Sequence, residues 1–308
     1  MTEETKEARN AQNVHESPAV GNWYDRYHNF LLLIPFLLLA ASLAYVGVFY
    51  TQHGDIMHKD VTLTGGTSLT IYSENVSLQA LETALSKKFN DVVVRSLTDL
   101  NTGKTIAVSV ETSASADAVK NETEAFLGYQ LTEKNSSIEF TGDSLSKSFY
   151  KELMTAILIA FLFMSIVIFI LFRSFLPSFY VIACAFSDIV IPLAMIDLLG
   201  VRISTAGIAA FLMLIGYSVD TDILLTTRVL KRKEEGTLNS RILGAMKTGL
   251  TMTITSLMAV LTAYFIAISP TLKQVFLILS IGLCADIIVT WLMNASLLKW
   301  YCEKRGYK

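Results

Sequence analysis

Six long apolar stretches constrain the fold of this chain more than any other feature. The sequence has 308 residues, of which 52% are hydrophobic, and about 20 helical residues cross a hydrocarbon core of about 30 Å. The stretches are Phe30–Tyr50, Leu153–Phe172, Phe175–Leu199, Ile203–Leu230, Leu250–Ile268 and Val275–Leu298. Arg173-Ser174 and Pro177-Ser178 mark a hairpin between the second and third stretches. We therefore expect an α-helical membrane protein with six transmembrane helices, the last five forming a bundle over residues 150–298.

The distribution of Lys and Arg predicts the orientation. If both termini are cytosolic, the two short outer loops hold only Arg202 and Lys273, whereas the inner segments hold fourteen Lys and Arg residues. This bias is typical of cytosolic loops, so residues 1–29 and 299–308 are expected to be cytosolic tails. The first tail is long, polar and of mixed charge, unlike a signal peptide. Phe30–Tyr50 is therefore expected to be a retained first helix.

Residues 52–148 form the one polar block large enough to fold by itself. Four β-rich runs and two runs with helical spacing follow one another in the order β-α-β-β-α-β, which is the ferredoxin-like arrangement. The runs are Thr67–Tyr72, Leu78–Phe89, Val92–Leu97, Thr105–Val110, Ala114–Leu127 and Ser137–Thr141, with a turn at 99–103. Two helices on one face would leave the other face of the sheet open to a partner or to solvent.

Three N-x-S/T sequences in this block, at Asn75, Asn121 and Asn135, fit an extracytosolic domain. A fourth, at Asn294, lies in a predicted span and is not expected to be modified. The block holds more acids than bases, which does not indicate binding of nucleic acid or anionic lipid.

Two carboxylates stand in the fourth span, at the end of the segment Gly216–Asp222. A carboxylate near the bilayer centre costs about 2.5–3.5 kcal/mol on insertion scales, so a relay or a polar switch is the default hypothesis. Asp220 and Asp222 are about 200° apart around a regular helix. One should face the bundle interior and the other a neighbouring helix or a partner subunit. Asp220 is the leading candidate, and the alternative is a neutral acid that bonds across helices.

Other polar residues lie within the spans. Asp188 and Asp286 lie near the middle of their spans, and each is expected to be a relay group, to form a hydrogen bond between helices, or to be a protonated spectator. Asp197 lies near the outer end of its span and is expected to reach water. The fifth span carries hydroxyls at Thr251, Thr255 and Thr262 on one helical face, with Thr253 and Ser256 beside them. These hydroxyls either support a carboxylate, as Thr221 also can, or bond to the carbonyls of their own helix.

No Lys or Arg within the spans is placed to pair with these acids. Burial without a base disfavours the charged form of a carboxyl, which makes proton coupling a hypothesis. The chain has no nucleotide-binding loop, metalloprotease motif or hydrolase motif. Its three cysteines, Cys184, Cys284 and Cys302, have no metal-site spacing. We therefore expect a protein that is not an enzyme, with no cofactor and no metal.

Several short motifs, in order, resemble those of the archaeal SecF proteins of the SecDF protein-export family. Gly65, Gly66 and Thr67 resemble the element that leads into the family's outer domain, and Arg173-Ser174 its first short loop. Gly216, Tyr217, Ser218 and Asp220, followed by Arg228, resemble the fourth-span signature, and Thr255-Ser256 resembles a fifth-span pair. One helix, an outer domain and five further helices is also the layout of that family.

The resemblance implies a role in Sec-dependent protein translocation. The family belongs to the resistance-nodulation-division superfamily, whose members use acids of the fourth span for proton-driven motion of their outer domains. The implied partners are SecD, the Sec channel subunits, the secreted polypeptide and membrane lipid, with no nucleic acid. The protein is implied to lie in the cell membrane.

The chain departs from the bacterial pattern at two positions. The bacterial acid aligns with Thr221, and a bacterial Arg aligns with Thr251. The relay could therefore lie in SecD, with Asp220 and Asp222 in a packing or gating role. Two other hypotheses stay open: a stand-alone exporter of small molecules or lipids that acts as a homodimer, and a scaffold protein in which the acids only pack helices.

Overall fold

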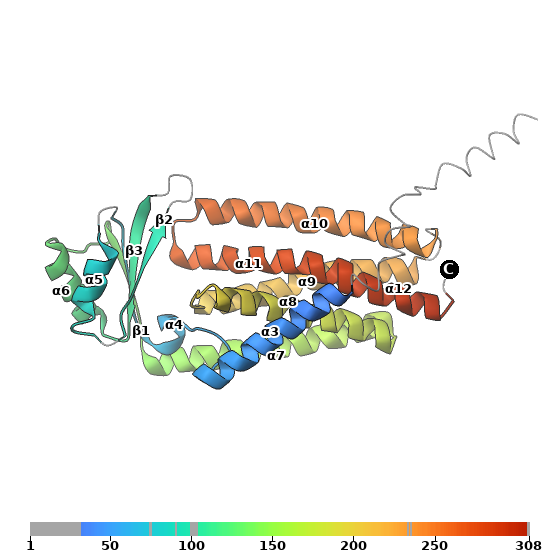
Figure 1. Ribbon diagram of the computed structural model, residues 1–308, viewed down its shortest axis with the longest axis horizontal. Coiled ribbons are helices and arrows are strands. Elements are labelled where there is room, and N and C mark those ends of the chain that lie inside the picture. Colours follow the sequence, from blue (N-terminus) through green and yellow to red (C-terminus); the bar gives the residue numbers. More distant parts are fainter. Residues whose placement is uncertain are drawn as a thin grey trace, which may run out of the picture.

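The computed structural model describes residues 32–73, 76–89, 91–98, 104–232, 234 and 236–306. Within these residues, six helices are long and apolar enough to cross a membrane, as predicted (Figure 1). They are α3 (Leu33–His53), α7 (Asp143–Phe172), α8 (Phe175–Leu198), α9 (Thr205–Lys231), α10 (Leu238–Ile266) and a last helix over Pro270–Lys304. The predicted tail 1–29, Asn75 and the turn at 99–103 lie outside the described residues.

The last helix consists of α11 (Pro270–Ile288), the π-helix η3 (Val289–Asn294) and α12 (Ala295–Lys304). It runs through most of the segment 299–308 that the sequence assigned to a tail, and Tyr301 and Cys302 are buried. Both α7 and α10 also begin well before the apolar stretches that predicted them. Their first turns are polar, and apolar composition alone does not locate the start of such a helix.

The bundle has central and peripheral helices. About two thirds of the apolar window of α8 and about half of those of α9 and α11 are buried, against less than a fifth in α3, α7 and α10. Large apolar side chains on the peripheral helices point outward, for example Leu158, Phe163 and Met258. Exposed apolar faces of this kind are expected where helices contact lipid. The central helices are therefore the place where polar side chains can be sheltered.

An α+β domain lies between α3 and α7 in the chain. Its strands β1 (Gly66–Ile71), β2 (Val93–Thr98), β3 (Thr105–Thr112) and β4 (Ser136–Thr141) form an antiparallel sheet in the order β2-β3-β1-β4. Helices α5 (Leu78–Leu85) and α6 (Ala116–Leu127) cover one face, over a core that includes Leu69, Leu81, Val108 and Val119. The predicted ferredoxin-like βαββαβ arrangement is confirmed.

Gly65 and Gly66 connect the short helix α4 (Val61–Thr64) to strand β1. Gly65 and Gly66 have φ angles of 92° and 135°, which L side chains rarely adopt. A Cβ on Gly66 would lie 3.0 Å from the Cα of Ser113 and closer still to a backbone oxygen of β3. The next residue, Thr67, donates its hydroxyl to the Ala114 carbonyl at 2.6 Å. This motif therefore serves the construction of the domain.

The second face of the sheet turns toward the helix bundle, which corrects the prediction of an open face (Figure 1). Arg202, in the loop between α8 and α9, forms an ion pair with Glu111 of β3 at 3.6 Å. Arg95 of β2 donates to the Gly200 carbonyl at 3.5 Å. A cavity of about 230 Å³ remains between the sheet and the ends of α9 and α11. The sequence could not show this, because the covering loop is distant in the chain.

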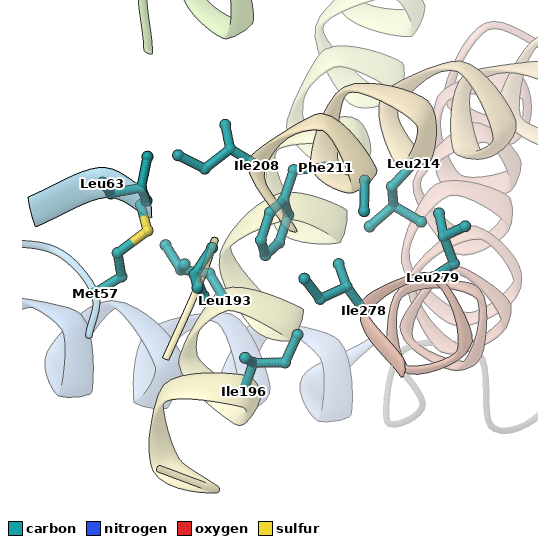
Figure 2. Close-up of a cluster of buried hydrophobic side chains, with 11 residues drawn as sticks. Met57, Leu63, Leu193, Ile196, Ile208, Phe211, Leu214, Ile278 and Leu279 are labelled. Atoms are coloured by element: carbon teal, nitrogen blue, oxygen red, sulfur yellow. The ribbon is translucent and has the colours of Figure 1, made fainter. Parts of the chain in front are cut away.

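Apolar side chains pack together near the α+β domain end of the bundle (Figure 2). We call this group the domain-side cluster. It consists of Met57, Leu63, Leu193, Ile196, Ile203, Ile208, Ala210, Phe211, Leu214, Ile278 and Leu279. On both α9 and α11 these residues lie between the polar helix start and the acids further along. The acids are therefore shielded from the domain side by packed aliphatic and aromatic side chains.

Candidate functional site: three acids within the helix bundle

Three of the four predicted acids meet in the centre of the bundle. Asp188 comes from α8, Asp222 from α9 and Asp286 from α11, and their exposed fractions are 1%, 0% and 0%. They belong to the three most buried helices, which are the central ones. We call these residues, with the hydroxyl and amide groups bonded to them, the acid cluster.

Asp286 has the most partners in this cluster. Its carboxyl accepts from Thr221 at 3.2 Å, from Thr290 at 3.0 Å and, more weakly, from Thr253 of α10 at 3.5 Å. The one proton of the Thr221 hydroxyl is shared with the carbonyl of Ser218, at 2.8 Å. The Ser218 hydroxyl in turn donates to Asp188. A continuous set of polar contacts therefore joins α8, α9, α10 and α11.

Asp222 accepts hydrogen bonds from two side chains of the π-helix η3. Its Oδ1 accepts from the Thr290 hydroxyl at 3.1 Å and from the Asn294 amide at 2.7 Å. The sequence prediction missed Thr290 and Asn294, although the signal was present. Asp286, Thr290 and Asn294 are spaced by four residues on a largely apolar helix, a spacing that places polar groups near one face.

Proton counting limits the charge that this cluster can hold. The Thr290 hydroxyl lies within hydrogen-bonding distance of both Asp222 and Asp286, yet it has one proton to donate. The second contact needs a proton on one of the two carboxyls. Among the described residues, no Lys, Arg or His is bonded to any of the three acids. Several uncompensated buried charges would be very costly, so the arrangement favours carboxyls that share protons.

The described residues contain no group of three or more His, Cys, Asp or Glu side chains arranged to hold a metal ion.

Asp220, the leading candidate from the sequence, lies on the opposite side of α9. It is exposed and lines a cleft of about 460 Å³ between α9 and α10. Arg228 lines the same cleft and donates to Thr248 at 3.2 Å. The two acids thus face different sides, as helical geometry requires.

Two of the predicted hydroxyls of α10, those of Thr251 and Thr255, lie on its exposed side, whereas Thr253 is buried and contacts Asp286. Thr251 donates to the carbonyl of Lys247 at 2.8 Å, and Thr255 donates to those of Thr251 and Met252. These are bonds within one helix, which was the alternative reading of this stripe. Ser256 is half-buried. On α9, the motif residues Gly216 and Tyr217 are exposed as well.

Asp197 differs from its prediction, because it is buried rather than open to water. It accepts from the His58 ring at 2.6 Å, from the His58 amide at 2.8 Å and from Tyr45 at 3.2 Å. These bonds join α3 and the segment that follows it to the last turn of α8. The expectation that Asp197 reaches water is therefore wrong.

Comparison with known proteins identifies the family. The family model "Protein export membrane protein SecD/SecF, C-terminal" matches residues 121–304. The chain belongs to the SecD/SecF family of protein-export membrane proteins. The protein-export membrane protein SecF of Methanothermobacter thermautotrophicus is 39% identical over 280 residues, which cover 88% of this chain and 93% of the relative. SecF of Methanocaldococcus jannaschii is 38% identical over 277 residues, covering 88% and 94%.

Solved structures of this family share the fold. The crystal structure of SecDF from Thermus thermophilus, a translocon-associated membrane protein, matches with a TM-score of 0.72 at 18% identity. The match covers 90% of this chain and 38% of the SecDF chain. This SecD/SecF-family chain therefore spans well under half of that SecDF polypeptide.

Proposed function

We propose that this protein is the SecF-type subunit of a SecD–SecF complex that assists protein export across the cell membrane, and that it is not an enzyme. Membership of the SecD/SecF family and the archaeal SecF relatives support the export role. We further propose that its work is coupled to proton movement through Asp188, Asp222 and Asp286. Its other partners would be the Sec channel, the secreted polypeptide and membrane lipid.

One observation supports proton coupling above all others. Three buried carboxyls on three helices are joined by hydroxyl groups, and no base is bonded to them among the described residues. Binding or loss of one proton changes which hydroxyl groups can donate and which carboxyls repel one another. Such a change alters the contacts between α8, α9 and α11. Intramembrane acids of this kind commonly mark proton relays.

The exposed side of α9 and α10 is the surface that we assign to SecD. A carboxylate facing lipid, as Asp220 would in an isolated subunit, is strongly unfavourable. The hydroxyls of Thr251 and Thr255, on the neighbouring helix α10, are exposed as well. A protein partner that carries polar groups would cover this face better than lipid does.

We also propose that both termini are cytosolic and that residues 52–148 lie outside. The scarcity of Lys and Arg in the two short loops on the side of the α+β domain supports this orientation. The domain would then stand where a secreted chain emerges.

Export in living cells tests the proposal. Asp188→Asn, Asp222→Asn and Asp286→Asn each remove a titratable group with little change in shape. We expect each to lower the secretion rate about tenfold or more, while the abundance of the protein and its co-purification with SecD stay normal. Asp117→Asn, on the exposed surface of α6, is the matched control and should export normally.

Two results would contradict the proposal in different ways. Normal export from all three variants would remove the proton role and leave the acids as structural groups. Purification as a homodimer without SecD would favour the stand-alone exporter. Asp220→Asn is measured alongside for SecD association, which should weaken if Asp220 faces the partner.

A further inference from the structure

The π-helix η3 is the irregular element of the bundle. It spans Val289–Asn294, between two regular helices. Its sequence, VTWLMN, contains neither Gly nor Pro, so no residue with unusual backbone preferences imposes it. Single π-turns inside α-helices are rare, and those that occur are often found at functional sites. The residues that this turn presents are therefore of interest.

The wide turn changes which residues share a face. In an α-helix, a residue four positions along is about 40° past a full turn, so eight positions accumulate about 80°. A π-turn holds more residues per turn, so residues four apart lie nearly above one another. Asp286, Thr290 and Asn294 consequently form one stripe toward α9. Thr290 and Asn294 are completely buried, and both bond to the same oxygen of Asp222.

Thr290 and Asn294 can each form a hydrogen bond in two protonation states of Asp222 and Asp286. The single Thr290 proton can be donated either to Asp222, at 3.1 Å, or to Asp286, at 3.0 Å. The Asn294 side chain carries both a donor and an acceptor. It donates to Asp222 as an anion, and after rotation of the amide it would accept from Asp222 as an acid. The Asn294 Oδ1 atom is buried and accepts no hydrogen bond from the described residues.

We propose that Thr290 and Asn294, presented by the π-turn, are positioning residues that decide whether Asp222 or Asp286 holds the shared proton. The inference rests on the proposed proton role of the acid cluster. In one state Thr290 and Asn294 both donate to an Asp222 carboxylate, and Asp286 keeps the proton. In the other state Thr290 donates to Asp286, and Asp222 donates its own proton to the rotated amide. The two states differ in the bonds that hold α9 against α11.

The test measures protonation at each acid in the complex with SecD, purified from cells. A hydrophobic carbodiimide reacts with protonated carboxyls, and mass spectrometry of the peptides separates Asp222 from Asp286. If the carbodiimide does not reach a buried carboxyl, the infrared absorption of protonated carboxyls measures its protonation instead. The Asp→Asn variants assign each absorption band to one residue. The variants are Thr290→Val, which removes the hydroxyl, Thr290→Ser, which keeps it, and Asn294→Leu. Thr155→Val is the matched control, because Thr155 is exposed on α7 and bonds only to its own helix.

We expect Thr290→Val and Asn294→Leu to change the ratio of protonation at Asp222 to that at Asp286 about tenfold, the effect of losing one hydrogen bond to a charged group. Thr290→Ser should restore the ratio to within about twofold, and Thr155→Val should not change it. An unchanged ratio in both Thr290→Val and Asn294→Leu, in complexes that remain assembled, would overturn the inference. If the ratio changes as expected and Asp222→Asn still exports normally, the positioning stands and the proposed coupling fails.

Discussion

Replacing Gly282 by Ala tests whether close contact between α9 and α11 holds the acid cluster together. Gly282 lies one helical turn before Asp286, and Leu214 one turn before Ser218. A Cβ on Gly282 would lie 2.9 Å from the Leu214 Cγ and 2.5 Å from its Cδ1, with Cδ2 closer still. Small residues permit such approach between membrane helices. We therefore expect Gly282→Ala to separate the two helices just before the acids.

The magnitude follows from the crowding at Leu214. Its Cγ and both methyl groups would be too close, and the residue is completely buried, so a rotamer change has no free space. Overpacking of this kind costs about 1–3 kcal/mol, and we take a value near the upper end. Ala favours a helix over Gly by about 1 kcal/mol. The expected net loss in the free energy of unfolding is therefore about 2 kcal/mol.

Leu214→Ala provides the second arm of a double-mutant cycle. By itself it leaves a cavity and should cost about 2–5 kcal/mol. In the double variant, the methyl group added at Gly282 occupies part of that space and the clash is gone. We expect the double variant to be more stable than the sum of the single changes by about 3 kcal/mol, because the clash is removed while the gain in helix propensity stays.

Reversible unfolding in mixed micelles with a rising fraction of denaturing detergent gives these free energies. Gly47→Ala is the matched control, because Gly47 lies inside α3 with no atom within 4 Å of an added Cβ. It should be neutral or slightly stabilising. Additive effects of Gly282→Ala and Leu214→Ala, within about 0.5 kcal/mol, would refute the close contact of α9 with α11. Export by Gly282→Ala should also fall, since the same displacement separates Asp222 from Asp286.

Further predictions concern the α+β domain. Burial raises the pKa of Asp60 to about 6. The stability that Asp60 contributes is therefore fully present below its ordinary pKa near 3.8 and is lost as the pH rises through 6. The melting temperature should fall between these pH values, and Asp60→Asn should make that fall smaller. Gly66→Ala should lower the free energy of unfolding by more than about 2 kcal/mol, because backbone atoms block the added methyl group, and Gly128→Ala should lower it by about 1 kcal/mol. Hydrogen exchange of the β1 and β3 amides measures both losses. The Lys88–Glu122 ion pair is on the surface, so Glu122→Gln should change thermal stability by less than about 1 kcal/mol.

The fold could be predicted largely from local patterns. Apolar runs of about 20 residues and alternating strands are properties of neighbouring residues, so six helices and a βαββαβ domain followed directly. The covered face of the sheet could not be predicted, because it depends on how Arg202 meets Glu111 from a distant part of the chain. The early starts of α7 and α10 were missed for a different reason. Their first turns lie beyond the apolar stretch and carry no signal in hydropathy.

The three acids of the acid cluster were predictable, but their arrangement and two of their partners were not. Asp188 and Asp286 were candidates because they are carboxyls in apolar helices. That they lie around Thr221 and Ser218 depends on the packing of α8 and α11 on α9. Thr290 and Asn294 were missed because a hydroxyl and an amide in a span are common, and because the π-turn that aligns them with Asp286 has no Gly or Pro to mark it.

The choice between Asp220 and Asp222 shows how the interior of a membrane bundle can be recognised in a sequence. In a soluble protein the apolar face of a helix is buried, but lipid is as apolar as a protein core, and polar side chains mark the buried face of a membrane helix instead. Asp222 has Ser218 and Thr226 four residues to either side, and both are completely buried. The corresponding neighbours of Asp220 are Gly216 and Leu224. Hydroxyl groups at four-residue spacing around an acid thus indicate which acid faces inward, whereas the sequence prediction weighed each acid alone.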